Sequence, residues 1–518
     1  MKHAGGALIP SLTIDRSDKA TLSTQLVTGL RRMILTGDLA VGTRLPATRI
    51  LARDQGVSRT TIVTVYDQLL AEGLIVSRVG AGTFVSEEVS LAPAPPPLTG
   101  NDPLPRLASL SRGASEQYFP RLSHPGSPRA FVTGMPAFDA FPMSTWARIS
   151  SQYWRSARAA IMSYPDPAGL PELRRAICQH LRANRGLVCE TEEVFVFAGA
   201  QDAFSQIAEM ILDPGEPVWM ENPGAIGARN AFYSRGARLV PVPVDEDGID
   251  VSQGLALEPA PRAIFVTPAH QHPLGVTMSR DRRFELLAAA GAAGAWIVED
   301  DYVGEFNYAK SPLPPLKALD GGGRVIYVGT FSKALFPAVR LGYAVMPPSL
   351  VDIFERALGA TAHGVSSAMQ SIVTRFIEEG HFSAHIRRMR ETYAERRDTL
   401  IEASARHLSG RIDVRPTETG FHTVGFLPEG GLGEAELERR AEGAGLATAS
   451  LGRFALAPLT RKGVTLGFSA VPPAELARGV ERLAALLGSV SSPPGSTPPP
   501  ARRSSGRAHP DCPPGSSA

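Results

Sequence analysis

Residues 329–343 read Gly-Thr-Phe-Ser-Lys-Ala-Leu-Phe-Pro-Ala-Val-Arg-Leu-Gly-Tyr and carry the strongest structural signal in this chain. This stretch follows an apolar segment, 325–328, which predicts a buried strand. Lys333 has a hydroxyl three residues before it, at Thr330, and a guanidinium seven residues after it, at Arg340. A phosphorylated aldehyde needs these groups, because the amine forms a Schiff base while the hydroxyl and the guanidinium hold the phosphate. The stretch therefore predicts a covalent cofactor site at the end of a strand.

A carboxylate and a phenol lie about thirty residues upstream of this lysine. Asp300 ends an apolar strand predicted at 296–300, and Tyr302 follows it. A buried carboxylate needs a partner, and the protonated nitrogen of a pyridine ring would be one. The ordinary alternatives are an aspartate that caps the next helix and, for Lys333 alone, a position on the surface. Taken together, the two segments predict a carboxylate and a phenol beside the cofactor.

The turn Ala-Gly-Ala-Gln at 198–201 stands between a predicted strand and a helical segment. Gly199, Ala200 and Gln201 would expose backbone N–H groups at a helix N-terminus, which is a natural seat for phosphate. Many turns between a strand and a helix share this pattern, so it supports a phosphate site only together with the segments above.

Two histidines, His270 and His272, lie in the proline-containing turn 267–275. They would point to opposite sides of an extended segment, and no third metal ligand is evident. The sequence therefore predicts no metal site.

The composition of the chain changes at three places. Residues 13–86 combine helical patterns with a glycine-punctuated hairpin, and residues 87–128 are rich in Pro, Ser and Gly, which predicts a linker. Residues 129–488 alternate strands with helical stretches, as α/β domains with a parallel sheet do, and residues 489–518 predict a disordered tail. The predicted strands lie at 194–198, 217–221, 263–267, 296–300 and 325–330.

The overall composition favours a cytoplasmic protein. The chain has 518 residues, a net charge of +2 and 43% hydrophobic residues, enough for several cores. Its three cysteines form neither a disulfide framework nor a metal-type spacing, which suits a reducing compartment. We find no signal-peptide pattern and no uncharged apolar run long enough for a membrane span, so we expect no membrane partner.

The N-terminal region has the order helix, turn, helix, helix and hairpin. The pattern predicts helices at 21–35, 46–55 and 59–72 and strands at 74–78 and 83–85. A winged helix-turn-helix has this order, and its third helix enters the major groove of DNA. Residues 1–86 hold ten Lys and Arg against six Asp and Glu, a net charge of +4 that permits binding to nucleic acid without requiring it.

The candidates for contact with double-stranded DNA lie at three places in this region. The third helix would present its first residues to base edges, the preceding helix would begin near the phosphates, and the hairpin would approach the backbone because its glycines lack bulk. An ordinary small helical domain with arginines on a solvated face is the alternative. The predicted contacts are Ser58, Arg59, Thr60 and Thr61 on the third helix, Arg44, Thr48 and Arg49 at the start of the preceding helix, and Arg78, Gly80 and Gly82 on the hairpin.

These motifs resemble known families. The N-terminal segments at 42–52, 56–61, 66–69 and 80–85 are similar to GntR-type winged-helix domains. The order of phosphate turn, proline turn, Asp-x-Tyr, Ser-Lys and arginine resembles fold-type I pyridoxal-phosphate aminotransferases over residues 129–488, which implies a mainly parallel sheet and a smaller C-terminal subdomain. A winged helix joined to such a domain is the layout of MocR/GabR-type transcriptional regulators, and the phrases at 299–302 and 329–333 are similar to that subfamily.

The resemblance implies pyridoxal 5'-phosphate as the cofactor and a role for each site residue. Lys333 would form the internal aldimine, Asp300 would pair with the pyridine nitrogen, and Tyr302 would bond the phenolic oxygen. His272 takes the place of an asparagine of the family. The phosphate would be held by Gly199, Ala200, Gln201, Thr330 and Arg340, and by Tyr164 from the neighbouring subunit of a homodimer.

Besides His272, three further positions depart from the aminotransferase pattern. Ala225 stands where an aromatic residue usually stacks on the cofactor, Leu274 replaces a threonine, and Thr465 stands where an arginine normally binds the substrate carboxylate. Arg453 and Arg461 are the candidates to replace that arginine. Loss of the carboxylate clamp weakens the binding and orientation of amino acids, so we expect a poor or inactive transaminase.

The sequence therefore predicts a cofactor-dependent transcriptional regulator that senses a small amine or amino-acid effector. The effector would exchange with Lys333 and shift the protein between two arrangements. An active aminotransferase with an accessory DNA-binding domain is the alternative. A repressor whose large domain only dimerises is a third interpretation, against which the retention of Lys333, Asp300 and Arg340 argues.

Overall fold

The computed structural model describes residues 9, 12–89, 128–156, 162–308, 313–361 and 364–488. The predicted tail at 489–518 and nearly all of the predicted linker at 87–128 lie outside these residues. The chain divides into two compact units, Met1–Arg106 and Leu107–Ala518. Each unit has its own core, and each is described by itself below.

The N-terminal unit is a winged helix-turn-helix, as the sequence predicts. Leu26 and Leu30 on one helix and Ile62 and Leu69 on another meet in its buried core. Ser58 caps the third helix, because its Oγ accepts a hydrogen bond from the N–H of Thr61 at 3.1 Å. The elements are α1 (Leu22–Leu35), α2 (Thr48–Asp54), α3 (Arg59–Ala71), β1 (Ile75–Arg78) and β2 (Gly82–Val85), with β1 and β2 antiparallel.

The large unit is built on an eight-stranded sheet with the strand order β3-β10-β9-β8-β7-β4-β5-β6. The pairs from β9 through β8, β7 and β4 to β5 are parallel, which confirms the predicted α/β class. Two predicted strands, 296–300 and 325–330, have the predicted bounds. The strands are β3 (Val194–Phe197), β4 (Pro217–Asn222), β5 (Arg238–Asp245), β6 (Gly248–Ile249), β7 (Ala263–Val266), β8 (Trp296–Asp300), β9 (Val325–Thr330) and β10 (Gly342–Val345).

One interior strand, β10, runs antiparallel to both of its neighbours, β3 and β9. The strands predicted from the sequence do not include it. The connection from β9 to β10 spans only residues 331–341, and a crossover between parallel strands needs a dozen residues or more, so the chain must return antiparallel. As a result, the beginning of β10 lies at the same edge of the sheet as the ends of β3, β8 and β9.

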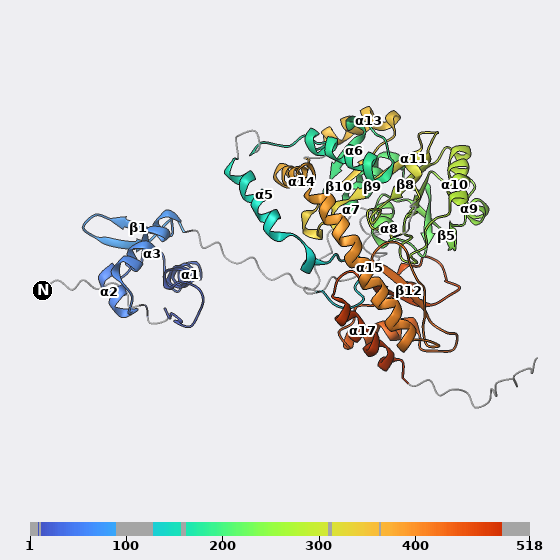
Figure 1. The fold of residues 1–518 in the computed structure, drawn as a ribbon. Coiled ribbons are helices and arrows are strands. Elements are labelled where there is room, and N and C mark those ends of the chain that lie inside the picture. The colour runs from blue at the N-terminus through green and yellow to red at the C-terminus, as the bar shows by residue number, and fades with distance from the viewer. Residues whose placement is uncertain are drawn as a thin grey trace, which may run out of the picture. The chain divides into compact units, whose positions relative to one another are not determined.

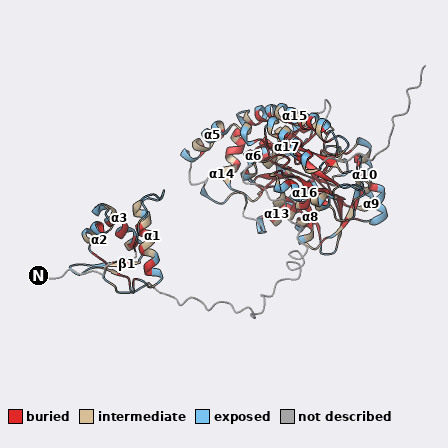
Figure 2. Cartoon of the chain, turned by 90° about the horizontal axis from the view of Figure 1, so that it is seen from below, coloured by how far each residue is buried: buried red, intermediate tan, exposed pale blue. Residues whose placement is uncertain are grey.

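Helices cover both faces of this sheet (Figures 1 and 2). Met220 on β4 packs in a cluster with Phe204 and Phe232, whereas its neighbour Trp219 packs in another cluster with Leu286, because alternate residues of a strand face opposite ways. The helices are α5 (Met143–Arg155), α6 (Pro171–Arg185), α7 (Ala200–Ile211), α8 (Ile226–Ser234), α9 (Val251–Leu257), α10 (Arg280–Ala293), α11 (Leu316–Leu319), α12 (Phe331–Ala334), α13 (Val351–Thr361), α14 (Ser367–Glu378) and α15 (His381–His407). The short 3-10 helices are η1 (Phe138–Ala140), η3 (Thr191–Glu193), η4 (Pro337–Val339), η5 (Pro348–Leu350) and η6 (Leu451–Phe454).

A smaller C-terminal subdomain completes the large unit. It contains an antiparallel sheet with the order β11-β12-β14-β13, and α17 packs against the long helix α15 (Figure 1). No helix of the described residues is both long and apolar enough to cross a membrane. The subdomain elements are β11 (Asp413–Val414), β12 (His422–Phe426), α16 (Glu434–Gly443), β13 (Ala449–Ser450), β14 (Gly463–Gly467) and α17 (Pro473–Leu486).

Candidate functional site

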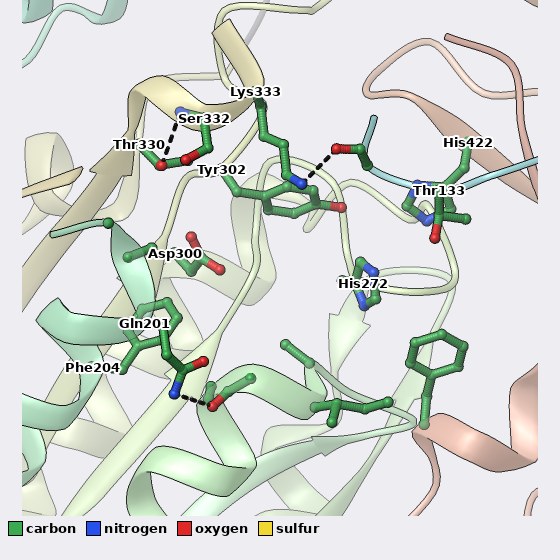
Figure 3. Close-up of a pocket in the computed structure, with 18 of the residues that line it drawn as sticks. Thr133, Gln201, Phe204, His272, Asp300, Tyr302, Thr330, Ser332, Lys333 and His422 are labelled. Atoms are coloured by element: carbon green, nitrogen blue, oxygen red, sulfur yellow. Dashed lines mark hydrogen bonds between the residues drawn. The ribbon is translucent and has the colours of Figure 1, made fainter. Parts of the chain in front are cut away.

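A cavity of about 300 Å³ lies at the edge of the large sheet where β3, β8 and β9 end and β10 begins (Figure 3). Ligands bind at this edge in open α/β sheets, because the strand ends and the following helix N-termini meet there. The structure brings nearly all the predicted cofactor residues together in its wall. These are Gly199, Ala200, Gln201, His272, Asp300, Tyr302, Thr330, Lys333 and Arg340.

Lys333 lies on the short helix α12, directly after β9, and its side chain enters the cavity (Figure 3). Its Nζ donates a hydrogen bond to the carbonyl oxygen of Gly134 at 2.6 Å. Burial lowers the pKa of Lys333 to about 8, although the nearby Asp300 carboxylate opposes this shift. A substantial fraction of the amine is therefore neutral, and nucleophilic, near neutral pH.

The rate at which pyridoxal phosphate attaches covalently to Lys333 should therefore rise with pH and level off above pH 8. The neutral amine is the nucleophile, and its fraction grows about tenfold per pH unit below a pKa of about 8. Stopped-flow absorption of the full chain mixed with the cofactor at a series of pH values measures this profile. An ordinary lysine would give a rate that still rises at about pH 10, and that profile would contradict the buried environment of this amine.

Three consecutive acidic residues at the end of β8 have three different environments. Glu299 accepts hydrogen bonds from the N–H groups of Leu316 and Lys317, at 2.8 and 2.9 Å. Asp301 accepts two hydrogen bonds from the guanidinium of Arg185, at 2.6 and 2.9 Å. Asp300 alone faces the cavity, because neighbouring strand residues point to opposite faces.

The buried Asp300 and Tyr302 each have a polar atom without a partner. Oδ1 of Asp300 and the hydroxyl of Tyr302 make no hydrogen bond within the described part of the chain. Burial, together with the charge of Asp301, raises the pKa of Asp300 well above its usual value, and burial also raises the pKa of the Tyr302 phenol. These two atoms are therefore poised for a ligand that carries a cationic N–H and an acceptor oxygen.

Another part of the cavity wall is suited to phosphate. Gly199 has a left-handed φ of 97°, and a Cβ there would lie 3.7 Å from the guanidinium of Arg340. The backbone of Arg340 also lies in the left-handed region, with a φ of 49°. Its guanidinium has no ion-pair partner in the described part of the chain. Ala200 and Gln201 supply the first backbone N–H groups of α7.

Two of the predicted phosphate contacts have side chains that already serve local structure. The Gln201 amide donates to the carbonyl of Gly227 at 2.9 Å, so its backbone N–H is the group left for phosphate. The Thr330 hydroxyl accepts from the N–H of Ser332 at 3.2 Å and caps α12. Ser332 also lines the cavity.

These features fit pyridoxal phosphate. The unpartnered Asp300 oxygen suits its pyridinium nitrogen, the Tyr302 hydroxyl suits its phenolic oxygen, and Lys333 suits its aldehyde. The Gly199 turn and Arg340 suit its phosphate. Each group of this cofactor therefore has a matching group in the cavity wall.

The structure corrects the expectation that His270 and His272 diverge. Their turn is not extended, and both rings contact His422 of β12, with centroid distances of 4.7 and 5.4 Å. His272 lines the cavity, whereas the ring of His270 is buried and its Nδ1 forms a hydrogen bond with the hydroxyl of Thr419. Within the described residues, no group of three acidic, histidine or cysteine side chains is arranged to hold a metal ion.

Several cavity residues escaped the sequence analysis. Thr133 and Gly134 come from the segment before α5, and His422 and Phe454 come from the C-terminal subdomain. Neither a strand-end pattern nor a charge marks them in the sequence. The glycine at 134 was the one available signal, because its φ is 70° and a Cβ there would lie 2.8 Å from Nζ of Lys333.

The candidate carboxylate clamps lie outside this cavity. Arg453 forms an ion pair with Glu438 at 2.6 Å, and Arg461 forms one with Asp413 at 3.0 Å. Thr465 is fully buried, and its Oγ1 accepts from the N–H of Ala449 at 3.3 Å. Ala225 does line the cavity, at the position where an aromatic ring was expected.

Tyr164 does not reach the cavity of its own chain. Its side chain is 91% exposed in the single subunit. The predicted contact with the phosphate of a neighbouring subunit therefore stays a prediction.

The predicted DNA contacts surround the start of α3. Arg59 and Thr60 are exposed on its first turn, and Arg49 is exposed on α2. Thr48 begins α2 and is half-buried. The hydroxyls of Ser58 and Thr61 hydrogen-bond each other at 2.8 Å, so they stabilise the N-terminus of α3.

One predicted DNA contact, Arg44, lies in a different place from the one predicted. Arg44 does not lie at the start of α2 but pairs as a β-bridge with Phe84, and its guanidinium lies beside Gly82. The glycines of the β1–β2 hairpin, Gly80 and Gly82, have positive φ angles of 72° and 116°. Arg78 forms an ion pair with Glu87 at 3.0 Å and lies over the ring of Phe84.

Comparisons with known proteins agree with both units. The model of the gntR family of bacterial regulatory proteins matches residues 22–85, and that of aminotransferase class I and II matches residues 134–445. The chain is 40% identical over 472 residues to the probable rhizopine catabolism regulatory protein MocR of Rhizobium meliloti, which covers 91% of this chain and 95% of that protein. It is 32% identical over 480 residues to the HTH-type transcriptional regulator TauR of Rhodobacter capsulatus, with 88% and 94% covered.

Solved structures of aminotransferases resemble the large unit. One is the kynurenine aminotransferase of Pyrococcus horikoshii in complex with PMP, with 27% identity, a TM-score of 0.64, and 74% of this chain and 95% of that chain covered. Another is the α-aminoadipate aminotransferase LysN of Thermus thermophilus, complexed with N-(5'-phosphopyridoxyl)-L-leucine, with 27% identity, a TM-score of 0.64, and 73% and 94% covered. The chain therefore belongs to the family of MocR-type transcriptional regulators, in which a GntR-type DNA-binding domain is joined to a pyridoxal-phosphate-dependent domain of aminotransferase class I and II.

Proposed function

We propose that this regulator senses a small amine or amino-acid effector at Lys333 and converts its presence into a change in DNA binding. The observation that carries the proposal is the meeting of the Lys333 amine, the Asp300 carboxylate and the Tyr302 hydroxyl in one buried cavity of a chain that also has a DNA-binding unit. Pyridoxal phosphate supplies an aldehyde that reacts reversibly with primary amines.

The residues around the cavity have separate tasks in this proposal. Asp300 holds a positive charge at the ring nitrogen, Tyr302 donates to the phenolic oxygen, and the Gly199 turn with Arg340 holds the phosphate. An amine that takes the place of Lys333 returns the lysine side chain to a buried site, and in the cofactor-free cavity burial lowers the pKa of this amine to about 8. The exchange therefore changes the charge beside Asp300, and any difference in affinity between two arrangements of the protein shifts their populations.

We infer little or no transaminase activity. Supporting this, Thr465 is buried and bonded within its sheet, and Arg453 and Arg461 are paired with acids elsewhere. An active aminotransferase is the alternative. Incubation of the cofactor-loaded chain with an amino acid and a 2-oxo acid decides between them, because sustained formation of the second amino acid over many turnovers would establish the enzyme.

The remaining predictions stay part of the proposal. We propose the boundaries 13–86, 87–128, 129–488 and 489–518, and the two family matches lie inside the first and third of these. We also propose a homodimer in which Tyr164 serves the partner's cavity. Two copies of α3 would then meet two half-sites of an operator in the cytoplasm, where the chromosome lies.

Replacement of Arg59 with alanine should weaken binding to a specific duplex by about 1–3 kcal/mol and relax its specificity, because Arg59 is exposed on the first turn of the reading helix. Arg53→Ala is the matched control, since Arg53 is an exposed arginine in the last turn of α2. Fluorescence anisotropy with a duplex selected from a random library, and with a scrambled one, measures both effects. Equal binding of both duplexes by the wild type and by R59A would exclude base reading by this residue.

A further inference from the structure

Positive charge in the cavity is limited to two side chains. Lys333 and Arg340 are the only lysine and arginine among the described residues that line it. Lys333 is the amine for the cofactor aldehyde, and Arg340 lies beside the Gly199 turn at the phosphate end. With the cofactor bound, no cation of the described wall remains for a carboxylate on the effector.

The two histidines of the wall do not supply that charge. Burial lowers the pKa of His422 to about 4, and it holds the pKa of His272 well below its usual value, with the neighbouring His422 adding to the effect. Both rings are therefore neutral at physiological pH. His422 Nε2 hydrogen-bonds the carbonyl oxygen of Pro273 at 3.1 Å, so Nε2 carries the proton and Nδ1 is an acceptor.

The same wall does offer uncharged groups that can form hydrogen bonds with a ligand. Nδ1 of His272 is buried and has no partner among the described residues. The Thr133 hydroxyl and the ring of Phe454 line the cavity beside the two histidines. A hydroxyl group can donate to an imidazole nitrogen and accept from another hydroxyl, whereas a carboxylate would lose its hydration without an opposing charge.

Two arginines, Arg229 and Arg453, are near the cavity but do not line it. Arg229 is buried and donates to the carbonyl oxygen of Arg453 at 3.1 Å, and Arg453 is paired with Glu438. Thr465 lies on the same face of the C-terminal sheet as His422, because Thr465 pairs with Val424, two residues along the strand from His422. This face therefore presents at position 465 a neutral hydroxyl that is already hydrogen-bonded.

From these observations we infer that the effector is a primary amine that carries hydroxyl groups and no carboxylate. The inference rests on the proposed sensing of an amine at Lys333 and narrows its chemical class. The amine reacts at the position of Lys333, and the hydroxyl groups bond to His272, His422 and Thr133.

Binding of three small amines to the cofactor-loaded full chain tests this inference. Ethanolamine and L-serine differ by one carboxylate, and ethanolamine and propylamine differ by replacement of the hydroxyl with a methyl group. Calorimetry and the shift in thermal midpoint, read beside the absorption spectrum, should show ethanolamine bound at least about tenfold more tightly than either of the others.

The possible results distinguish the inferred class of effector from the proposed sensing of amines at Lys333. L-serine bound as tightly as ethanolamine would overturn the exclusion of carboxylates and would point to a cation from a partner subunit, while leaving the sensing of amines intact. Propylamine bound as tightly as ethanolamine would overturn the role of hydroxyl groups. Failure of all three to bind, up to high millimolar concentration, would overturn both the inference and the proposed sensing of amines.

A substitution provides an independent check. Thr465→Arg places a cation on the face of the C-terminal sheet that also carries His422, and it should raise the affinity for L-serine at least about tenfold relative to Thr465→Val, which loses the same hydrogen bond without adding charge. Unchanged preference for ethanolamine in a folded T465R protein would contradict the inference. The wild-type comparison still decides the question if T465R does not fold.

Discussion

Replacement of Lys333 with alanine is expected to abolish the covalent attachment of pyridoxal phosphate to this protein. The wild-type chain, loaded with the cofactor and reduced with borohydride, should retain the cofactor through denaturation, and the K333A chain should retain none. The reason is that Lys333 is the one lysine in the described cavity wall, where burial lowers its pKa to about 8. Mass spectrometry of the denatured chains measures the attachment directly.

Lys317→Ala is the matched control for this experiment. Lys317 lies in the same unit, and burial also lowers its pKa, but it does not line the cavity. The K317A chain should therefore attach the cofactor as the wild type does. Attachment to K333A at the wild-type level would show that another amine holds the cofactor, and the assignment of the cavity would then be wrong.

Replacement of Asp300 with asparagine is expected to have opposite effects on cofactor affinity and on the stability of the cofactor-free chain. The affinity should fall by about 1.5–3 kcal/mol, roughly 10- to 150-fold, because a charged hydrogen bond to the ring nitrogen is lost. The affinity is measured by titration of the absorption band. An unchanged affinity would show that this carboxylate does not bind the ring nitrogen.

The stability of the cofactor-free D300N chain should exceed that of the wild type at neutral pH. The pKa of Asp300 is raised in the folded protein, so ionisation of this buried group disfavours folding once the pH exceeds its unfolded pKa of about 4. The difference should therefore grow as the pH rises above about 4 and vanish below it. Urea unfolding at a series of pH values checks the sign, and a D300N chain less stable than the wild type at pH 7 would contradict it.

The parts of the site that the sequence predicts are those set by local chain geometry. Lys333 and Asp300 each lie at or just after the end of a parallel strand, and parallel strands bring their carboxyl ends to one edge of the sheet. Gly199 begins a helix after such a strand, so its role follows from the same rule. The third helix of the winged unit could also be predicted from the sequence, because Ser58 marks its N-terminus.

The parts that the sequence analysis missed depend on contacts between distant segments. His422 and Phe454 enter the cavity from the C-terminal subdomain, far along the chain from Lys333, so no local pattern places them there. The strand β10 was not among the predicted strands, and its antiparallel direction follows from the short connection after β9 rather than from its own residues. Its position between β3 and β9 is what brings Arg340 back beside Gly199.

Binding of an amine in the cavity should change the affinity of this protein for DNA, and DNA affinity measured with and without an amine shows whether it does. The cofactor-loaded full chain is titrated with a duplex selected from a random library, in the absence and presence of saturating ethanolamine, beside K333A. We expect the amine to change the wild-type affinity at least about fivefold, corresponding to about 1 kcal/mol of coupling, and to leave the affinity of K333A unchanged. A wild-type DNA affinity that stays constant while calorimetry shows that ethanolamine binds would show that the cavity and DNA binding are not coupled.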